Sequence, residues 1–203
     1  MIQCFLYDQL YPDAKIPSYQ LETTAYPNLY EGLRISIFYS AAATFRAPSD
    51  ISGITGMHLE YIRATPSWRQ GPPRYDCIFV NSADDTKAEG VHHLEIGRVM
   101  AFFSVVHGDE EYQCALIHWF SRSDTEPDED TGLWVVEPDF EDDGNPFLAI
   151  IHVDSIFRAA HLLPVYQTNQ FTSRSLTMHE TLDTFKQFYV NKFVDYHAFA
   201  IVF

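Results

Sequence analysis

Cysteine and long apolar runs are scarce in this chain. Its 203 residues include only three cysteines, Cys4, Cys77 and Cys114, which form no C-x-x-C pair. An odd number of cysteines, two of them inside apolar stretches, indicates buried thiols in a reducing compartment rather than a disulfide framework. No stretch approaches the roughly 18 apolar residues that a membrane-spanning helix needs, and no secretory signal is apparent. We therefore expect an intracellular protein, nuclear or cytoplasmic, with no membrane partner.

Basic residues are also few. Lys and Arg number 13 against 28 Asp and Glu, which gives a formal net charge of −15. A protein that grips nucleic acid over a broad face needs a basic footprint for the phosphates. The charge therefore argues against direct nucleic-acid binding. It favours a basic partner, such as a Lys/Arg-rich tail of another protein.

The motifs of common enzyme classes are missing. The sequence contains no G-x-S-x-G nucleophile elbow, no G-x-x-x-x-G-K phosphate loop and no G-x-G-x-x-G dinucleotide loop. The segment "HETLD", which begins at His179, lacks the second histidine of the H-E-x-x-H zinc motif. We expect no cofactor and assign no catalytic residue.

One enzymatic alternative stays open. His152 and Asp154 form an H-x-D pattern, and His161 follows them closely. Two histidines and a carboxylate are the ligands of facial-triad iron sites. A histidine pointing off a sheet beside a capping aspartate explains the same pattern without a metal. A metal-dependent enzyme that uses this His/Asp cluster is therefore the alternative to a binding function.

What the sequence does contain is a series of β-type segments from residue 75 onward. Hydrophobic residues make up 46% of the chain and aromatic residues 15%, enough for a substantial core. Gly108 lies between two long β-rich runs and predicts a hairpin turn. The predicted strands are "YDCIFVN", "EIGRVMAFFSVV", "EYQCALIHWFSR", "GLWVVEP" and "FLAIIHV". We expect an α+β fold, mostly β, with a strongly bent sheet or small barrel and peripheral helices.

The remaining segments predict short helices and a boundary. Helical spacing after Asp154 predicts one or two turns, and a strand follows over Leu163–Tyr166. Residues 179–193 carry apolar side chains at helical spacing, which predicts an amphipathic helix, and "YHAFAIVF" predicts a closing strand. We expect residues 1–74 to be an extended arm packed on the core, with one helical turn. Residues 75–203 would form the β core with its C-terminal helix.

Aromatic and acidic residues come together around residues 114–143. Trp119 and Trp134 lie on neighbouring predicted strands, and Trp68 and Tyr75 lie in the turn-rich segment before them. Between residues 124 and 143 there are ten Asp or Glu and no Lys or Arg, and Asp128, Glu129 and Asp130 form the centre of this acidic loop. Aromatic faces attract ammonium groups by about 0.5–2 kcal/mol per contact. We expect these residues to form a peptide-binding surface with an acidic rim.

A core position explains the same tryptophans. Alternation places Cys114, Leu116, His118 and Phe120 on one strand face, and Ala115, Ile117, Trp119 and Ser121 on the other. Both faces carry apolar residues, so alternation does not decide which face is buried. A third possibility is a purely structural assembly domain in which the aromatic stripe of residues 179–193 docks a partner.

Several long strings resemble a known family of transposon proteins. "FLYDQLYPD", "ATFRAPSDISGITGM", "IRATPSWRQGPPRYDCIFVN", "DEDTGLWVVEPD" and "FYVNKFVDYHAFAIVF" resemble the C-terminal region of fungal Plavaka-type transposon proteins, in order and over nearly the whole chain. The resemblance implies a fragment or stand-alone copy of a transposase tail. The nuclease core of such a protein would lie upstream, so transposition activity is not implied for this chain.

A second resemblance covers about residues 75–166. The strands "YDCIFV", "GRVMAFF", "ALIHWFSR" and "LWVVEPD" are similar to those of bromo-adjacent-homology (BAH) domains. Trp119, Phe120 and Arg122 match the family's middle-strand motif, and Glu137 matches its later acidic residue. BAH domains act in chromatin, where they bind histone tails or other proteins, some through an aromatic cage for methyl-lysine. That cage lies in variable loops, so the resemblance assigns no cage residue here. It implies a non-enzymatic module that binds a basic peptide such as a histone tail.

Overall fold

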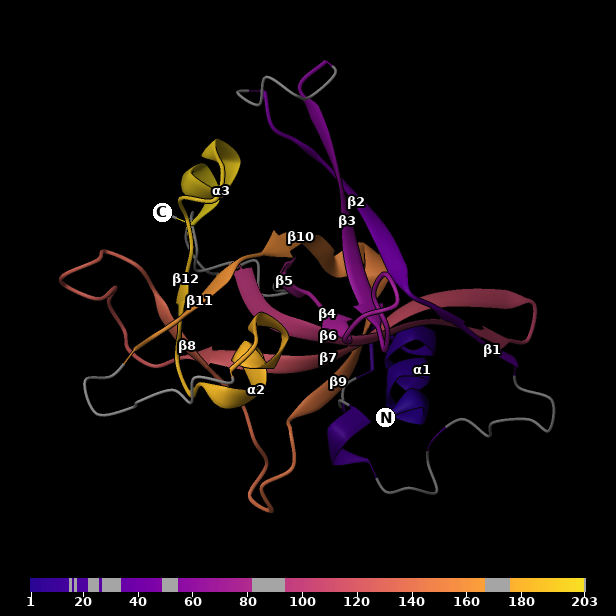
Figure 1. The fold of residues 1–203 in the computed structure, drawn as a ribbon. Helices are drawn as coiled ribbons and strands as arrows, with labels where there is room; N and C mark the ends of the chain where they lie inside the picture. Colours follow the sequence, from indigo (N-terminus) through magenta and orange to yellow (C-terminus); the bar gives the residue numbers. More distant parts are fainter. Residues whose placement is uncertain are drawn as a thin grey trace.

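β-Strands dominate the computed structural model of this protein (Figure 1). It describes residues 1–14, 16, 18–21, 26, 34–48, 55–81, 94–166 and 176–202. The strands are β1 (Arg34–Phe38), β2 (Ser40–Arg46), β3 (Met57–Thr65), β4 (Arg74–Tyr75), β5 (Cys77–Asn81), β6 (Leu94–His107), β7 (Glu110–Arg122), β8 (Val135–Pro138), β9 (Leu148–His152), β10 (Ile156–Ala160), β11 (Leu162–Pro164) and β12 (Phe188–Val190). The helices are α1 (Ile2–Leu10), α2 (Thr181–Thr184) and α3 (Tyr196–Ile201), with 3₁₀ turns η1 (Ser18–Gln20), η4 (Val153–Ser155) and η5 (Met178–Glu180).

Nine of the strands form one antiparallel sheet that curls into a nearly closed barrel. The hydrogen-bonded order is β10-β5-β6-β7-β8-β12-β11. Only His161 separates β10 from β11, so the first and last strands of this order are two halves of one bent strand. The barrel interior is filled by Phe79, Ile96, Phe120, Val136, Phe185, Phe188, Val190 and Val202. The predicted mostly β fold with a small barrel is therefore confirmed.

The two longest strands, β6 and β7, extend beyond the barrel as a twisted hairpin. The far half of β6 pairs with β1 and the middle of β7 pairs with β9. One end of the β2–β3 hairpin covers one face of these strands through Ile62 and Ala64. The other end of the hairpin projects away from the barrel (Figure 1). Helix α1 covers the other face through Phe5 and Leu6. Residues 114–117 of β7 therefore have apolar cover on both sides, which explains why both of their faces are apolar.

Most predicted strands are present, and three predictions near the C-terminus are wrong. Gly108, with φ +64°, forms the turn of the β6–β7 hairpin as predicted. The amphipathic helix expected over residues 179–193 is only the short α2, because Phe188 and Val190 alternate into the barrel as β12. The segment after Asp154 is η4 and then β10 rather than helix. The closing strand expected from Tyr196 is α3, which Asp195 caps by accepting from the Ala198 backbone N–H.

The first ten residues contain more helix than predicted. Helix α1 has nine residues where one turn was expected. β1 pairs with β6, and β3 contributes to the apolar cluster on β5, β6 and β7. The division between residues 74 and 75 stays a prediction.

Candidate functional site

A surface groove of about 490 Å³ lies where β6, β7 and β8 meet. It combines an indole, two phenyl rings and carboxylates. The groove is lined by Leu94, Glu95, Ile96, Trp119, Phe120, Ser121, Arg122, Val136, Asp139 and Phe147. Of the aromatic residues that the sequence singled out for binding, Trp119 is the one that lines it.

Trp119 is positioned by backbone pairing and by a close approach of two strands. It lies opposite Gly97 on β6. A Cβ at Gly97 would be 3.4 Å from Cε3 of the indole, so the ring lies against the bare backbone of this glycine. The Trp119 N–H donates to the Phe147 carbonyl (3.2 Å), and the Asp139 N–H donates to the Trp119 carbonyl (2.9 Å). These bonds hold Asp139 and Phe147 beside the indole, which is half-buried.

Among the described residues that line the groove, the charged side chains are two carboxylates and one guanidinium. Asp139 accepts a hydrogen bond from Ser121 Oγ at 2.8 Å, and Glu95 lies on the β6 side. Arg122 lies with its Cζ 4.7 Å from the centre of the Trp134 ring, and burial lowers the pKa of its guanidinium. An indole face beside two carboxylates is an environment that stabilises an ammonium or guanidinium group.

The other aromatic residues expected at the site lie elsewhere. Trp134 packs against the barrel core under Arg122. Tyr75 packs against the cluster beneath the β2–β3 hairpin, and Arg98 lies 5.6 Å from its ring centre. Trp68 lies among three arginines. Among the described residues, no ring contact joins any two of Trp68, Tyr75, Trp119 and Trp134, so the structure does not bring them together as one cage.

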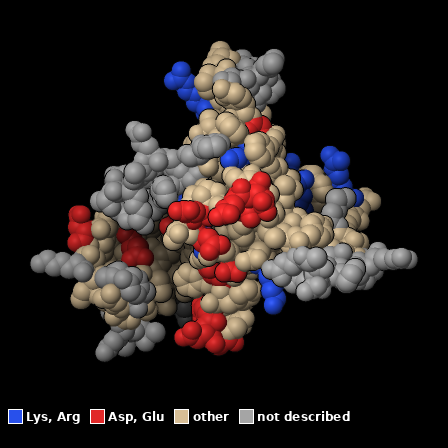
Figure 2. All heavy atoms as spheres, turned by 90° about the vertical axis from the view of Figure 1, so that its left-hand side faces the viewer, with Lys and Arg blue, Asp and Glu red and all other residues tan. Residues whose placement is uncertain are grey.

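The acidic loop does not form the rim of the groove. Asp128 Oδ1 accepts from the Thr131 N–H (2.8 Å) and hydroxyl (2.6 Å), and these bonds lower the pKa of its carboxyl. Asp128 therefore caps a turn, while Glu129 and Asp130 are exposed to solvent. Figure 2 shows acidic side chains gathered on the side of the molecule where β8, β11 and β12 lie. Among the residues that the structure describes, the carboxylates that line the groove are Glu95 and Asp139.

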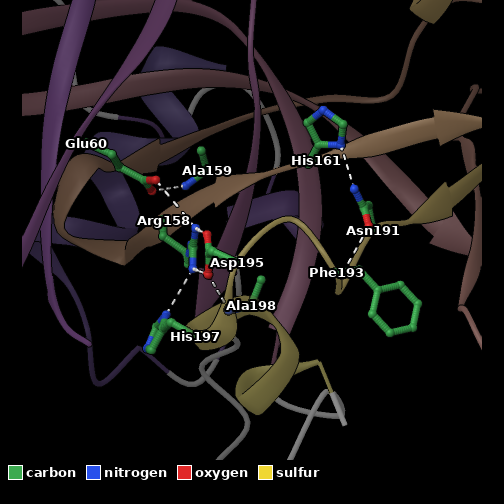
Figure 3. Close-up of polar contacts among 9 residues, drawn as sticks. All are labelled: Glu60, Arg158, Ala159, His161, Asn191, Phe193, Asp195, His197 and Ala198. Carbon is green, nitrogen blue, oxygen red and sulfur yellow. Dashed lines mark hydrogen bonds and ion pairs between the residues drawn. The ribbon is translucent and has the colours of Figure 1, made fainter. Parts of the chain in front are cut away.

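The predicted histidine and aspartate ligands are not assembled. His152 Nδ1 accepts from the Asp154 N–H at 3.2 Å and lies 3.3 Å from its carboxylate. His161 instead contacts the Asn191 side-chain nitrogen at 3.1 Å (Figure 3). In the described part of the chain, no three His, Cys, Asp or Glu side chains are grouped so that they could hold a metal ion.

A buried ion cluster that the sequence did not reveal surrounds Arg158 (Figure 3). Arg158 is 3% exposed and donates to both oxygens of Asp195, at 3.0 and 2.5 Å. It also donates to His197 Nδ1 at 3.0 Å and lies 3.6 Å from Glu60. The ring of Phe45 lies 4.6 Å from its Cζ and stacks on His197. The cluster therefore joins β3, β10 and α3 at one point.

The protonation states of this cluster follow from its contacts. Hydrogen bonds from Arg158 lower the pKa of Asp195 to about 2. Burial, and then the Arg158 charge, lowers the pKa of His197. Because a guanidinium can only donate, His197 Nδ1 must accept, and its ring is neutral. Burial raises the pKa of Glu60, against the opposing hydrogen bond from the Ala159 N–H. The cluster holds the last helix on the barrel, and both terminal nitrogens of Arg158 are used within it.

Comparison with known proteins adds no relative. No family model, no curated protein and no solved structure matches the chain. Of the helices in the described ranges, none is long and apolar enough to cross a membrane.

Proposed function

We propose that this chain is a non-enzymatic interaction module that binds a Lys/Arg-rich segment of another protein in the groove beside Trp119. The observation that carries the proposal is the placement of Glu95 and Asp139 beside a half-buried indole in one groove. A lysine or arginine side chain would lie along the rings of Trp119 and Phe147. Its charged end would approach the two carboxylates.

The charge of the whole chain supports this assignment. A net charge of −15 raises the local concentration of basic segments and speeds their encounter with the surface. The resemblance to BAH domains supports a histone tail as the basic segment. The resemblance to Plavaka-type proteins supports a transposon-derived, fungal protein that works on chromatin in the nucleus. These finer assignments depend on the two resemblances, whereas the binding of a basic segment depends on the groove.

The experiment is a titration with fluorescein-labelled, Lys/Arg-rich peptides, including histone tails with unmodified and trimethylated lysine. Fluorescence anisotropy gives Kd for the wild type, Glu95→Gln and Asp139→Asn. Each substitution removes one groove charge and keeps the side-chain size. We expect each to weaken binding by about threefold to tenfold.

The matched control is Glu129→Gln, which removes the same charge from an exposed loop position outside the groove. It should leave Kd unchanged within about a factor of two, because a single exposed charge contributes little. If all three variants lost affinity equally and the affinity fell steeply with salt, the peptide would be attracted by the overall negative charge of the protein. That result would reject the groove as the binding site. Absence of saturable binding to any basic peptide would reject the proposed function itself.

A further inference from the structure

Three guanidinium groups surround the indole of Trp68, and none of these four residues lines the groove beside Trp119. The Cζ atoms of Arg63, Arg69 and Arg74 lie 4.6, 5.4 and 5.5 Å from the ring centre. Arg63 also lies 5.0 Å from the centre of the Tyr61 ring. A guanidinium stacked on a ring keeps its N–H edge free, and that edge matches the two oxygens of a carboxylate.

The loop that carries Trp68 and Arg69 is held by its own hydrogen bonds. The Trp68 N–H donates to the Pro72 carbonyl (3.0 Å), and the Gly71 N–H donates to the Trp68 carbonyl (2.9 Å). Arg69 and Gln70 have φ of 51° and 61°, a left-handed conformation that costs about 1–2 kcal/mol for each residue other than glycine. The bonds across the loop offset this strain and fix the place of Arg69 before any ligand binds.

Around Trp68 the arginines outnumber the carboxylates that pair with them, although the protein as a whole is acidic. Arg74 pairs with Asp76, with Nε–Oδ1 at 2.7 Å. Among the described residues, no carboxylate lies within ion-pair distance of Arg63 or Arg69. The guanidiniums of half-buried Arg63 and exposed Arg69 therefore have no counter-ion from the described parts of the chain. Guanidiniums without a counter-ion can pair with the carboxylates of an anionic partner.

Apolar side chains continue the same face along β3. Leu59 and Tyr61 alternate with inward-facing residues on this strand and are 53% and 57% exposed. Arginine and aromatic side chains beside aliphatic ones are typical of the centres of protein–protein interfaces. A nucleic acid would use the arginines and the rings but not the aliphatic Leu59. A second copy placed symmetrically on this face would bring the two sets of arginines together, so the charge disfavours it.

We propose that Leu59, Tyr61, Arg63, Trp68, Arg69 and Arg74 form a docking face for an extended acidic segment of another protein. The face pairs aspartate or glutamate side chains with Arg63 and Arg69, and it packs apolar side chains of the segment on Leu59 and Tyr61. The inference is independent of the groove at Trp119. Together the two sites would let one small domain hold a basic and an acidic partner.

The test measures the binding of two labelled probes to the whole chain by anisotropy. One probe is a peptide of alternating Glu and Leu, and the other is an oligothymidylate of similar charge. We expect saturable binding of the peptide, weakened about tenfold in the double variant Arg63→Gln/Arg69→Gln. Tyr61→Ser should weaken the same probe through the loss of apolar contact. Arg34→Gln, at an exposed position of β1, is the control and should leave Kd unchanged.

Three results would overturn the proposal. Stronger binding of the oligothymidylate than of the peptide would identify a nucleic-acid site instead. Equal weakening by Arg34→Gln would show attraction without a defined site, and no binding of either probe would remove the docking face. Circular dichroism melts check that the variants remain folded. Binding of basic peptides in the groove should be the same in the arginine variants, so the two sites are tested separately.

Discussion

Arg158 on β10 and Asp195 before α3 form a two-point ion pair, with Nη1–Oδ1 at 3.0 Å and Nη2–Oδ2 at 2.5 Å. The same Asp195 oxygen that faces Nη1 also caps α3 by accepting from the Ala198 N–H at 2.7 Å. One carboxylate therefore starts the last helix and ties it to the barrel wall. Glu60 approaches the same guanidinium from β3, so Arg158 balances two carboxylates from distant parts of the chain.

Removal of Arg158 should destabilise the fold strongly. Arg158→Met keeps the length of the side chain but leaves Asp195 and Glu60 close together without a cation. Breaking a buried pair on one side costs about 3–5 kcal/mol, which corresponds to a fall in melting temperature of about 10 °C for a domain of this size. Thermal and urea unfolding measure the loss. Arg34→Met, at an exposed site on β1, should change stability by less than about 0.5 kcal/mol. Equal stability of the two variants would contradict a structural role for the cluster.

Acidification should weaken the same cluster in two stages. The pKa of His197 is lowered from 6.5, so between that lowered pKa and 6.5 the unfolded chain binds a proton that the folded chain does not. Stability from His197 is therefore complete above pH 6.5 and is lost as the pH falls below it. Asp195 adds a second loss as the pH falls from 3.8 towards about 2. Glu60 has the opposite sign, because its raised pKa lets the folded chain hold a proton above pH 4.5.

The variant His197→Gln tests the loss of stability that comes from protonation of His197. Its side-chain oxygen can still accept from Arg158, but it does not titrate. Urea midpoints measured between about pH 5 and 7.5 should fall less steeply with acid in the variant than in the wild type. Parallel curves for the two proteins would show that His197 does not contribute to the pH dependence.

The sequence predicted the β core well because local patterns are sufficient there. The alternation of β6 and β7 and the glycine at residue 108 predict their hairpin directly. The failure over residues 179–193 has a physical cause. Phe185 and Phe188 have helical spacing, but Phe188 and Val190 also alternate, and pairing with β8 and β11 favours the strand. The strand is stabilised by pairing with segments that are distant in sequence, and a short stretch of sequence carries no information about such pairing.

The candidate site was predictable only in part. Trp119 was recognised from its aromatic neighbourhood, but Glu95 and Asp139 reach it from β6 and from the segment after β8. The acidic loop attracted attention in the sequence because its carboxylates are so closely spaced. In the structure, its Asp128 instead stabilises a turn by accepting from the Thr131 N–H. Arg158 and Asp195 are 37 positions apart in sequence, and Glu60 is 99 positions from Ala159, which it also contacts. The helix-capping aspartate of the Arg158 cluster was the one local signal available.

The contact between Gly97 and its neighbours predicts a coupled effect of two substitutions. A Cβ at Gly97 would overlap Cγ2 of Ile117 and press on the Trp119 indole. Gly97→Ala should therefore cost about 1–3 kcal/mol by overpacking and should shift the tryptophan emission. Adding Ile117→Ala makes room for the new methyl group, so the double variant should lose less than the sum of the single losses. If the two losses in the free energy of unfolding simply added, β6 and β7 would have to move apart at Gly97 without strain.

The three thiols should differ sharply in reactivity. Burial raises the pKa of Cys77 to about 12 and that of Cys114 to about 11, and both residues are at most 4% exposed. At pH 8 about one in a thousand of these thiols, or fewer, is ionised, and only the thiolate reacts with alkylating reagents. Cys4 is half-buried on α1 and should be the first to react. Iodoacetamide labelling followed by peptide mass spectrometry measures each rate, and labelling in urea should modify all three. If Cys77 or Cys114 reacted in native buffer as fast as Cys4, the sheet between the two covering layers would have to open far more often than its packing allows.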